Sequence, residues 1–304
     1  MKIAWRTLLK NKGYTALNIT GMAIGLASCL LIGLYIRNEL SYDEYHVKKD
    51  RIYRVVHGYK EIGTSGTTKA GQKGNYTYQI WGNAPVGKAL EADFPGVEEV
   101  VQFSGRSPVL LRYGDKAFQE DNVFFADSNT FSVFSWKLLA GNPKTALVAP
   151  YSAVLTKSTA KKYFGDENPI GKTIEGGNTG GRAAPGVYTV TGILEDIPPN
   201  SHFTFDALMS MSSFKQSEAA LFDEWGYVDF YTYFLLSEKA NLEQLTADIP
   251  AFLNRHHAND DGRYSIAFEP MLNAYLHSSA DRQPGATGSL ANLYIFGVIG
   301  IFIG

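Results

Sequence analysis

The sequence predicts an α+β domain that lies outside the cytoplasm and is flanked by transmembrane α-helices. Two apolar stretches, at 17–36 and 295–304, and the alternating strand-like and helix-like patterns between them predict this fold class. A helix rises about 1.5 Å per residue, so about 20 residues cross the roughly 30 Å hydrocarbon core of a bilayer. The stretch 17–36 carries no charge, and a helix satisfies its own backbone groups in lipid. We therefore expect a first transmembrane helix at 17–36.

The charges around this stretch predict its orientation. Four basic residues and no acidic one precede it: Lys2, Arg6, Lys10 and Lys12. Charges of both signs follow it: Arg37, Glu39, Asp43 and Glu44. A Lys/Arg excess beside a membrane helix marks the cytoplasmic side. We expect the N-terminus in the cytoplasm and the region after 36 outside.

Residues 1–16 are expected to form a cytosolic amphipathic segment. Trp5, Leu8 and Leu9 fall on one helical face, with Arg6 beside them, a pattern typical of a helix on a membrane surface. These four residues are the candidates for contact with the inner leaflet. An ordinary positively charged flank explains the same residues equally well.

Cys29 offers a second interpretation of the first apolar stretch. Residues 26–29, LASC, have the form of a lipoprotein processing site, and cleavage there would leave a domain anchored by lipid on Cys29. The apolar run nevertheless continues through LLIGLYI after Cys29, whereas the apolar region of a signal peptide spans about 7–15 residues and ends near the cut. An uncleaved membrane helix is the favoured interpretation.

Small residues recur every fourth position within this helix. Gly21, Gly25, Cys29 and Gly33 would give it one face of small side chains, on which a second membrane helix can approach closely. The three glycines are therefore candidates for helix packing. The alternative is that glycine is simply common in membrane helices.

The apolar stretch at 295–304 is too short to cross a bilayer. We interpret residues 290–304 as the start of a second transmembrane helix that is truncated in this sequence. The chain is then expected to be the front of a longer membrane protein.

The region 41–289 is expected to be an extracytoplasmic domain in two parts. Strand-like and helix-like segments at its two ends predict a βαβ unit, and a strand-rich insert is expected at about 146–224. Asn241 should cap a helix that Pro250 bends or ends early. The segment Gly176 to Gly186 is expected to be a glycine-rich loop.

The same region contains no convincing catalytic, cofactor or metal motif. GDENPIGKT at 165–173 has one residue too many for a P-loop and leaves a short helix instead of entering one. The six histidines lack metal-ligand spacing, and Glu195-Asp196 are expected to begin a loop. A net charge of −2 and a pI of about 6.3 argue against nucleic acid. We expect a chain that is not an enzyme and binds no cofactor.

Five segments together resemble the MacB/FtsX-type permeases of ABC transporters. They occur in the family's order along almost the whole chain: AWRTLLKNKGYTALNITGMAIGLASCLLI, ELSYDEYHVKKDRIYRVV, VLTKSTAKKYFGDENPIGKTI, YTVTGILEDIPPNSHFTFDAL and ANLYIFGVIGIFIG. The resemblance implies a periplasmic core domain with a porter-like βαβ unit and an inserted strand-rich subdomain. It also implies a multi-pass protein of the bacterial inner membrane.

The resemblance further implies the partners and the mechanism. A separate cytosolic ATPase subunit would supply ATP hydrolysis, and the chain would pair with a second permease copy or a homologue in the lipid bilayer. Movement of the periplasmic domain would act on a periplasmic client or adaptor protein, in efflux or in the handling of lipoproteins or peptides. The segment around Trp5 would then lie near the ATPase or the inner leaflet.

Two functional hypotheses follow from the sequence. The leading one is a permease subunit whose outer domain binds or pushes a periplasmic client. The alternative is a sensor or binding domain outside the cytoplasm, anchored by one helix or by lipid on Cys29.

Overall fold

The computed structural model describes residues 12–60, 76–104, 107–178, 184–257 and 263–303. The chain divides into two compact units. The helix-pair unit comprises Met1–Tyr42 and Gly288–Gly304, and the sheet unit comprises Asp43–Thr287. Each unit is described by itself.

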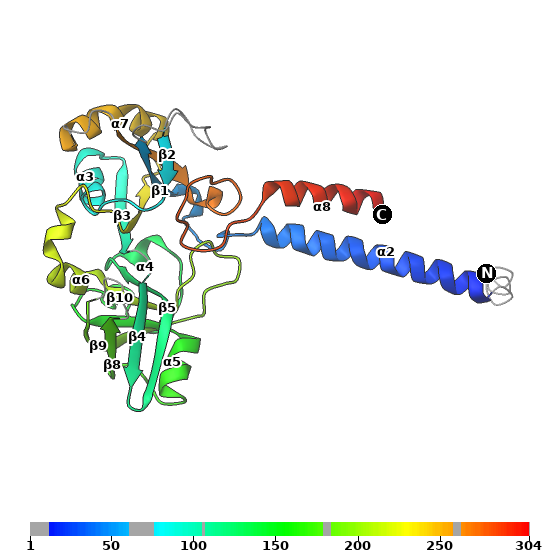
Figure 1. Cartoon of the computed structure of the whole chain (residues 1–304), viewed down its shortest axis with the longest axis horizontal. Coiled ribbons are helices and arrows are strands. Elements are labelled where there is room, and N and C mark those ends of the chain that lie inside the picture. Colours follow the sequence, from blue (N-terminus) through cyan, green and yellow to red (C-terminus); the bar gives the residue numbers. More distant parts are fainter. Residues whose placement is uncertain (1–11, 61–75, 105–106, 179–183, 258–262, 304) are drawn as a thin grey trace. The chain divides into compact units, whose positions relative to one another are not determined.

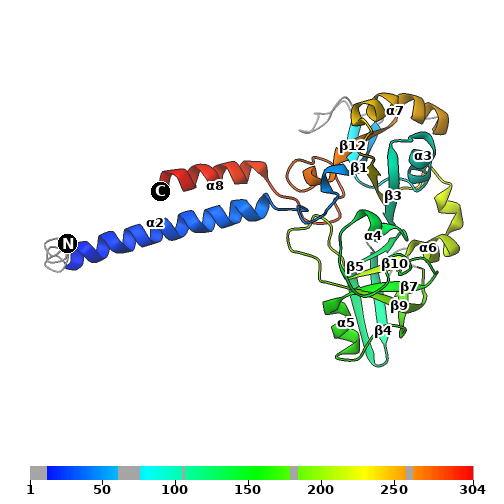
Figure 2. The same cartoon turned by 180° about the vertical axis from the view of Figure 1, so that it is seen from behind.

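The helix-pair unit contains α2 (Lys12–Glu39) and α8 (Leu290–Ile303). Among the described residues, α2 is the helix that is both long and apolar enough to cross a membrane, and α8 is apolar but shorter. The two helices run side by side (Figures 1 and 2). The rings of Tyr35 and Phe296 meet edge to face with their centroids 5.2 Å apart.

The sheet unit is built on a split βαβ arrangement. Its strands lie in the order β3-β11-β1-β12, and each is antiparallel to its neighbours. One βαβ half contains β1 and β3, and the other contains β11 and β12. The strands of the two halves therefore alternate across the sheet, as in other split βαβ folds. The elements of this part are β1 (Ile52–Lys60), α3 (Pro85–Asp93), β3 (Val97–Ser104), β11 (Phe230–Leu236), α7 (Leu242–His256) and β12 (Tyr264–Pro270). The expected α+β character is confirmed.

Side chains on the two faces of these four strands pack into two different hydrophobic cores. Successive side chains of a strand point to opposite faces. Val55 and Phe234 pack under α3 and α7, whereas Val56 and Tyr233 face a second core rich in aromatic rings. Both faces of the four strands are therefore buried, which accounts for their nearly continuous apolar sequences. Figure 1 shows α3 and α7 together at one end of the sheet unit.

The inserted part lies between β3 and β11 in the sequence. Six of its strands pair in the order β10-β7-β9-β8-β4-β5, and β10 also pairs with β5, so they form a closed ring. Apolar side chains such as Val109, Phe125 and Tyr188 fill this ring. Its elements are β4 (Ser107–Tyr113), β5 (Lys116–Ala126), α4 (Thr130–Val133), β6 (Leu138–Gly141), β7 (Ser152–Thr156), α5 (Lys157–Phe164), β8 (Thr173–Asn178), β9 (Gly186–Leu194), β10 (Ala207–Ser210), α6 (Met211–Ser217) and η2 (Ala219–Phe222).

Several local features differ from the sequence-based expectations. The ring begins at Ser107 instead of at 146, because β4 and β5 pair with strands of the expected insert. Gly176 and Gly177 belong to β8, where they pair with Leu111 and Leu110, so the loop to β9 is shorter than expected. Two short 3₁₀ turns, η1 (Lys49–Arg51) and η3 (Met271–Asn273), and the strand β2 (Tyr76–Gln79) complete the described elements.

Of the two effects expected of Pro250, an early end of its helix is wrong. α7 continues through Pro250 to His256. Asn241 caps its start as expected, since Oδ1 accepts a hydrogen bond from Glu243 N at 2.8 Å. Pro250 lies on the exposed side, while Leu245, Ile249 and Phe252 are buried against the sheet. Packing of this apolar face stabilises the helix despite the backbone hydrogen bond that proline removes.

Candidate functional site

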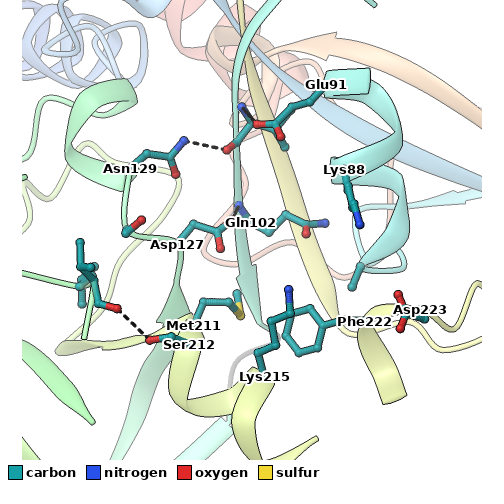
Figure 3. A pocket seen from close by; sticks show the side chains of 16 residues that line it. Lys88, Glu91, Gln102, Asp127, Asn129, Met211, Ser212, Lys215, Phe222 and Asp223 are labelled. Carbon is teal, nitrogen blue, oxygen red and sulfur yellow. Dashed lines mark hydrogen bonds between the residues drawn. The ribbon is translucent and has the colours of Figure 1, made fainter. Parts of the chain in front are cut away.

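A pocket of about 560 Å³ lies where the split βαβ part meets the inserted part. Its walls come from α3 and β3 on one side and from α6 and η2 on the other. Asp127 and Asn129, which follow β5, line it as well (on the left in Figure 3). Pockets of about 300–1,000 Å³ with a few convergent polar groups are typical of ligand sites.

Two lysines supply the positive charge of this pocket. Lys88 lies on α3 and Lys215 on α6, and Figure 3 shows their amino ends directed into the space between the two helices. Nζ of Lys215 lies 5.6 Å from the centre of the Phe222 ring. Lys88 is exposed and has no hydrogen-bond or ion-pair partner in the part of the chain that the structure describes.

Three carboxylates line the same pocket: Glu91 on α3, Asp127 after β5 and Asp223 after η2. Oδ2 of Asp127 accepts a hydrogen bond from Gln102 N at 2.7 Å, and Oε1 of Glu91 accepts one from Val100 N at 3.2 Å. Burial raises the pKa of Asp127 to about 6, and the negative charge of Glu91 adds to this, against the opposing effects of the Gln102 N–H and Lys215. Asp127 therefore titrates close to neutral pH.

The helix α3 approaches the floor of the pocket closely because residue 87 is glycine. A Cβ at Gly87 would lie 2.7 Å from Cδ of Gln102. The Gln102 side chain is itself buried and donates from Nε2 to Thr232 Oγ1 at 2.9 Å. Gly87 thus leaves room for the amide that forms the floor.

A second polar cluster lies at the start of the sheet unit. Oδ2 of Asp43 lies 2.8 Å from Nδ1 of His202, and Nε2 of His202 lies 2.9 Å from the hydroxyl of Tyr233. Burial alone would raise the pKa of Asp43, but the charge and hydrogen bonds of His202 outweigh it and hold this pKa below 3.8. Asp43 also has a positive φ of 61°, a conformation that aspartate tolerates better than most residues.

This cluster extends to a buried arginine. The side chain of Arg54 is fully buried, and its Nε donates to Oε2 of Glu269 at 2.7 Å, while Nη1 donates to Gln283 at 2.8 Å. A buried charge with such partners is costly to expose or to unpair. We call these connected side chains the polar brace of the sheet unit: Asp43, His202, Tyr233, Arg54 and Glu269.

His46 lies beside this brace but plays a different part. Its Nδ1 accepts a hydrogen bond from Ser135 N at 3.0 Å. Burial lowers the pKa of His46 to about 4, so the ring is neutral and able to accept. The role is structural packing against Phe134 and Trp136.

The predicted helix-packing residues are only partly brought together. A Cβ at Gly25 would lie 3.7 Å from Cγ2 of Ile303, and Sγ of Cys29 lies 3.6 Å from the carbonyl oxygen of Gly300. A Cβ at Gly21 or Gly33 would have no neighbouring atom within 4 Å among the described residues. Positions four apart rotate by about 40° around a helix, so Gly33 turns away from α8 while Ile32 lies against Gly300. Gly21 lies one turn before Gly25, which already faces Ile303, the last residue of α8.

The predicted membrane-surface residues Trp5, Arg6, Leu8 and Leu9 lie outside the described residues. The loop after Asn178 is also largely outside them. The expectation that Glu195-Asp196 begin a loop is consistent with their contacts: Asp196 accepts from Ser158 N at 2.9 Å, and Glu195 pairs with Lys137.

The sequence did not point to either polar cluster. Lys88, Glu91 and Asp127 are ordinary surface residue types far apart in the chain, and only the sheet topology brings them together. His202 and Asp43 are 159 positions apart in the sequence. The sequence signal that could have pointed to His202 is the segment IPPNSHF, in which two prolines restrict the backbone shortly before the histidine. Within the described residues, no group of three His, Cys, Asp or Glu side chains has the arrangement of a metal site.

Comparison with known proteins identifies the class. The family model described as the MacB-like periplasmic core domain matches residues 15–252. A search of curated proteins gave no match. The chain belongs to the family of proteins with a MacB-like periplasmic core domain, which are ABC-transporter-type permeases.

Three solved structures are similar. A domain of a permease protein from Porphyromonas gingivalis has a TM-score of 0.58 at 21% identity, covering 82% of this chain and 98% of that one. The periplasmic region of MacB from Actinobacillus actinomycetemcomitans has a TM-score of 0.48 at 16% identity, covering 71% and 88%. The extracellular domain of the noncanonic ABC-type transporter YknZ from Gram-positive bacteria has a TM-score of 0.45 at 17% identity, covering 70% and 99%. The first of these supports the fold of the sheet unit.

Proposed function

We propose that this protein is the permease subunit of an ABC transporter. It would couple ATP hydrolysis by a separate cytosolic ATPase subunit to movement of the domain at 41–289. The observation that carries the proposal is the family match over 15–252, which spans the apolar helix α2 and most of the sheet unit. A long apolar helix that leads directly into a folded domain suits a role in transmitting movement.

The proposed topology follows the charges and the two apolar helices. Residues 1–16 lie in the cytosol, 17–36 cross the bacterial inner membrane, 41–289 are periplasmic, and 290–304 begin a second transmembrane helix. Trp5, Arg6, Leu8 and Leu9 contact the inner leaflet or the ATPase. Gly21, Gly25 and Gly33 allow close packing of membrane helices.

The proposed partners are the ATPase subunit, a second permease copy or homologue, the lipid bilayer and a periplasmic client or adaptor. The chain itself is proposed to be non-catalytic and to hold no cofactor. Its action serves efflux or the handling of lipoproteins or peptides.

Topology can be tested through the chain's single cysteine, Cys29. In a Cys29→Ser background, Asn11→Cys and Asp115→Cys place one thiol before α2 and one at the exposed turn between β4 and β5. A membrane-impermeant maleimide added to cells with a permeabilised outer membrane should label the second thiol and spare the first. Labelling of both would overturn the proposed topology. A mature wild-type protein that starts at Cys29 would support the anchored sensor instead.

Coupling can be tested by spin labels on Asp115→Cys in the membrane-embedded complex. The distance distribution between the two copies should shift when ATP is bound in place of ADP. The same distance distribution with ATP and with ADP, while the ATPase hydrolyses ATP, would overturn the proposed coupling. A variant with the label on Glu243→Cys, which lies on exposed α7, gives a second distance across the same dimer.

A further inference from the structure

The chain enters and leaves the sheet unit through two segments that contact the same residue, His202. Asp43 is the first residue of this unit after α2, and Gly285 lies shortly before its last residue, Thr287, and before α8. His202 belongs to the segment between β9 and β10 of the inserted part. Figures 1 and 2 show this segment, in yellow-green, reaching from the ring towards the blue start and the orange end of the unit.

The entering segment is bound to the segment of His202 by backbone and side-chain groups. Asp43 N donates to the carbonyl oxygen of Asn200 at 2.9 Å. Oδ1 of Asp43 accepts from His202 N at 3.2 Å, and Oδ2 lies 2.8 Å from Nδ1 of His202. The Tyr45 hydroxyl donates to Oγ of Ser201 at 3.0 Å. Separating the two segments would leave several buried polar groups unpaired, which is costly, so we expect them to move together.

The leaving segment contacts His202 through its backbone. A Cβ at Gly285 would lie 2.4 Å from the carbonyl oxygen of His202, so no side chain fits between the two segments at this point. Two residues earlier, Oε1 of Gln283 accepts from Nη1 of the buried Arg54 at 2.8 Å. Arg54 in turn bonds Tyr233, whose hydroxyl lies 2.9 Å from Nε2 of His202. The leaving segment therefore reaches His202 both directly and through the polar brace.

The residue after His202 lies in the aromatic core between the two parts of the sheet unit. Phe203 is 1% exposed. The centre of its ring lies 4.8 Å from that of Phe103 on β3 and 4.7 Å from that of Phe124 on β5. A close-packed core does not deform continuously. A shift of the backbone at His202 is therefore passed through Phe203 to the split βαβ part and to the inserted part.

We propose that residues 200–203 form a mechanical joint that connects both ends of the sheet unit to the core between its two parts. Asp43 and Gly285 hold the joint from outside, and Phe203 carries its movement into the core. A small displacement of the entering or the leaving segment then changes how the ring lies against the split βαβ part. The joint rests on the proposed function in one respect, since ATP hydrolysis would supply the displacement.

Distances within one chain test the joint in the membrane-embedded complex without nucleotide. Spin labels on Asp115→Cys in the ring and Glu243→Cys on α7 report the arrangement of the two parts, in a Cys29→Ser background and with labelled chains diluted by unlabelled ones. Gly285→Ala replaces a 2.4 Å approach by one that needs at least 3.4 Å, so the backbone must move by about 1 Å. The distance distribution should shift or become wider.

Two further variants separate the joint from a general loss of stability. Tyr45→Phe removes one hydrogen bond to Ser201 and keeps the ring, so it should widen the distribution in a protein that still folds. Gly82→Ala overlaps the ring of His57 and does not contact the joint, so it should leave the distribution unchanged. An unchanged distribution in Gly285→Ala and Tyr45→Phe would overturn the joint. The same change in Gly82→Ala as in Gly285→Ala would also overturn it.

Adding nucleotide separates the joint from the proposed coupling. In the wild type, the distance within the chain should shift between ADP and ATP, and Tyr45→Phe should reduce this shift while ATP hydrolysis continues. A full shift in Tyr45→Phe would overturn the joint and leave the coupling intact. Altered distributions in the nucleotide-free variants, without any nucleotide-dependent shift in the wild type, would support the joint and overturn the coupling.

Discussion

Oδ2 of the Asp43 carboxylate lies 2.8 Å from Nδ1 of the His202 imidazole. Asp43 is the first residue of the sheet unit, and His202 lies in the segment between β9 and β10 of the inserted part. Both side chains are almost fully excluded from solvent. The pair therefore joins the beginning of this unit to its inserted part.

Removing one member of this pair should strongly destabilise the protein. Asp43→Asn leaves the imidazole of His202 without its charged partner, and we expect the free energy of unfolding to fall by about 3–5 kcal/mol. Urea unfolding followed by tryptophan fluorescence measures this loss. Lys137→Gln, which removes an exposed ion pair, should cost at most about 1 kcal/mol. Equal losses in the two variants would contradict the assignment.

Acid should remove the same contribution. The pKa of Asp43 is held below 3.8 in the folded protein, so its ionised form stabilises the fold above that pH. The stability is lost as the pH falls through the folded pKa. The wild type should lose more stability than Asp43→Asn when unfolding is compared at neutral pH and near pH 3. Parallel losses would show that other groups dominate acid unfolding.

Asp127 should have the opposite pH dependence. Its pKa is raised to about 6, so the protonated form is favoured in the folded protein. The stabilising effect is complete below about pH 4 and is lost as the pH rises to about 6. Asp127→Asn should flatten this part of the stability profile and add about 1–2 kcal/mol at neutral pH. Thermal unfolding at a series of pH values measures the effect, and an unchanged slope would refute it.

Gly82 should not tolerate even a methyl group. A Cβ there would overlap the ring of His57, which is fully buried and hydrogen-bonded through Nδ1 to the Tyr264 hydroxyl at 2.6 Å. We expect Gly82→Ala to cost about 1–3 kcal/mol. Gly226→Ala, where a Cβ meets only the end of the Glu224 side chain at 3.9 Å, is the matched control.

A double-mutant cycle identifies the cause of that loss. In a His57→Ala background the overlap is gone, so Gly82→Ala should cost less than it does in the wild type. The same penalty in both backgrounds would point to the backbone of residue 82 and away from the ring.

Gly25 should control how closely α8 lies against α2. Gly25→Leu places a large side chain against Ile303, and the displacement of α8 should expose Cys29. We expect faster modification of the Cys29 thiol by N-ethylmaleimide in membranes. Gly21→Leu, which meets no described atom within 4 Å, should leave the rate unchanged. A Gly25→Leu protein with normal Cys29 reactivity, dimerisation and transport would count against a packing role.

The fold was predicted best where local pattern decides it. The strand-like and helix-like segments at the two ends of 41–289 and the Asn241 cap of α7 are local signals, and the split βαβ part is built from these segments. The ring was harder, because its closure depends on the pairing of β5 with β10, whose sequence separation leaves no local trace. Pro250 shows the same limit in reverse, since the packing of Ile249 and Phe252 overrides a strong local signal.

The candidate site was missed for a related reason. Lys88, Asp127 and Lys215 lie on three elements whose proximity is a product of tertiary packing, and each residue type is common on surfaces. The pKa of Asp127 depends on burial that no short stretch of sequence reveals. The sequence showed which family the chain resembles, but not where within the domain charges of both signs converge.

The pairing of Ser104 with Phe230 has a consequence for how such a domain can change during evolution. The chain leaves the split βαβ part at the end of β3 and returns at the start of β11, and these two points are neighbours in one ladder. In the backbone alone, a short turn from Ser104 to Phe230 would restore an uninterrupted hairpin. The side chains prevent a simple deletion, because Phe124, Phe134 and Phe203 of the inserted part cover the second face of the four strands. The inserted part can therefore vary in length and on its outer surface, provided that this aromatic layer is kept.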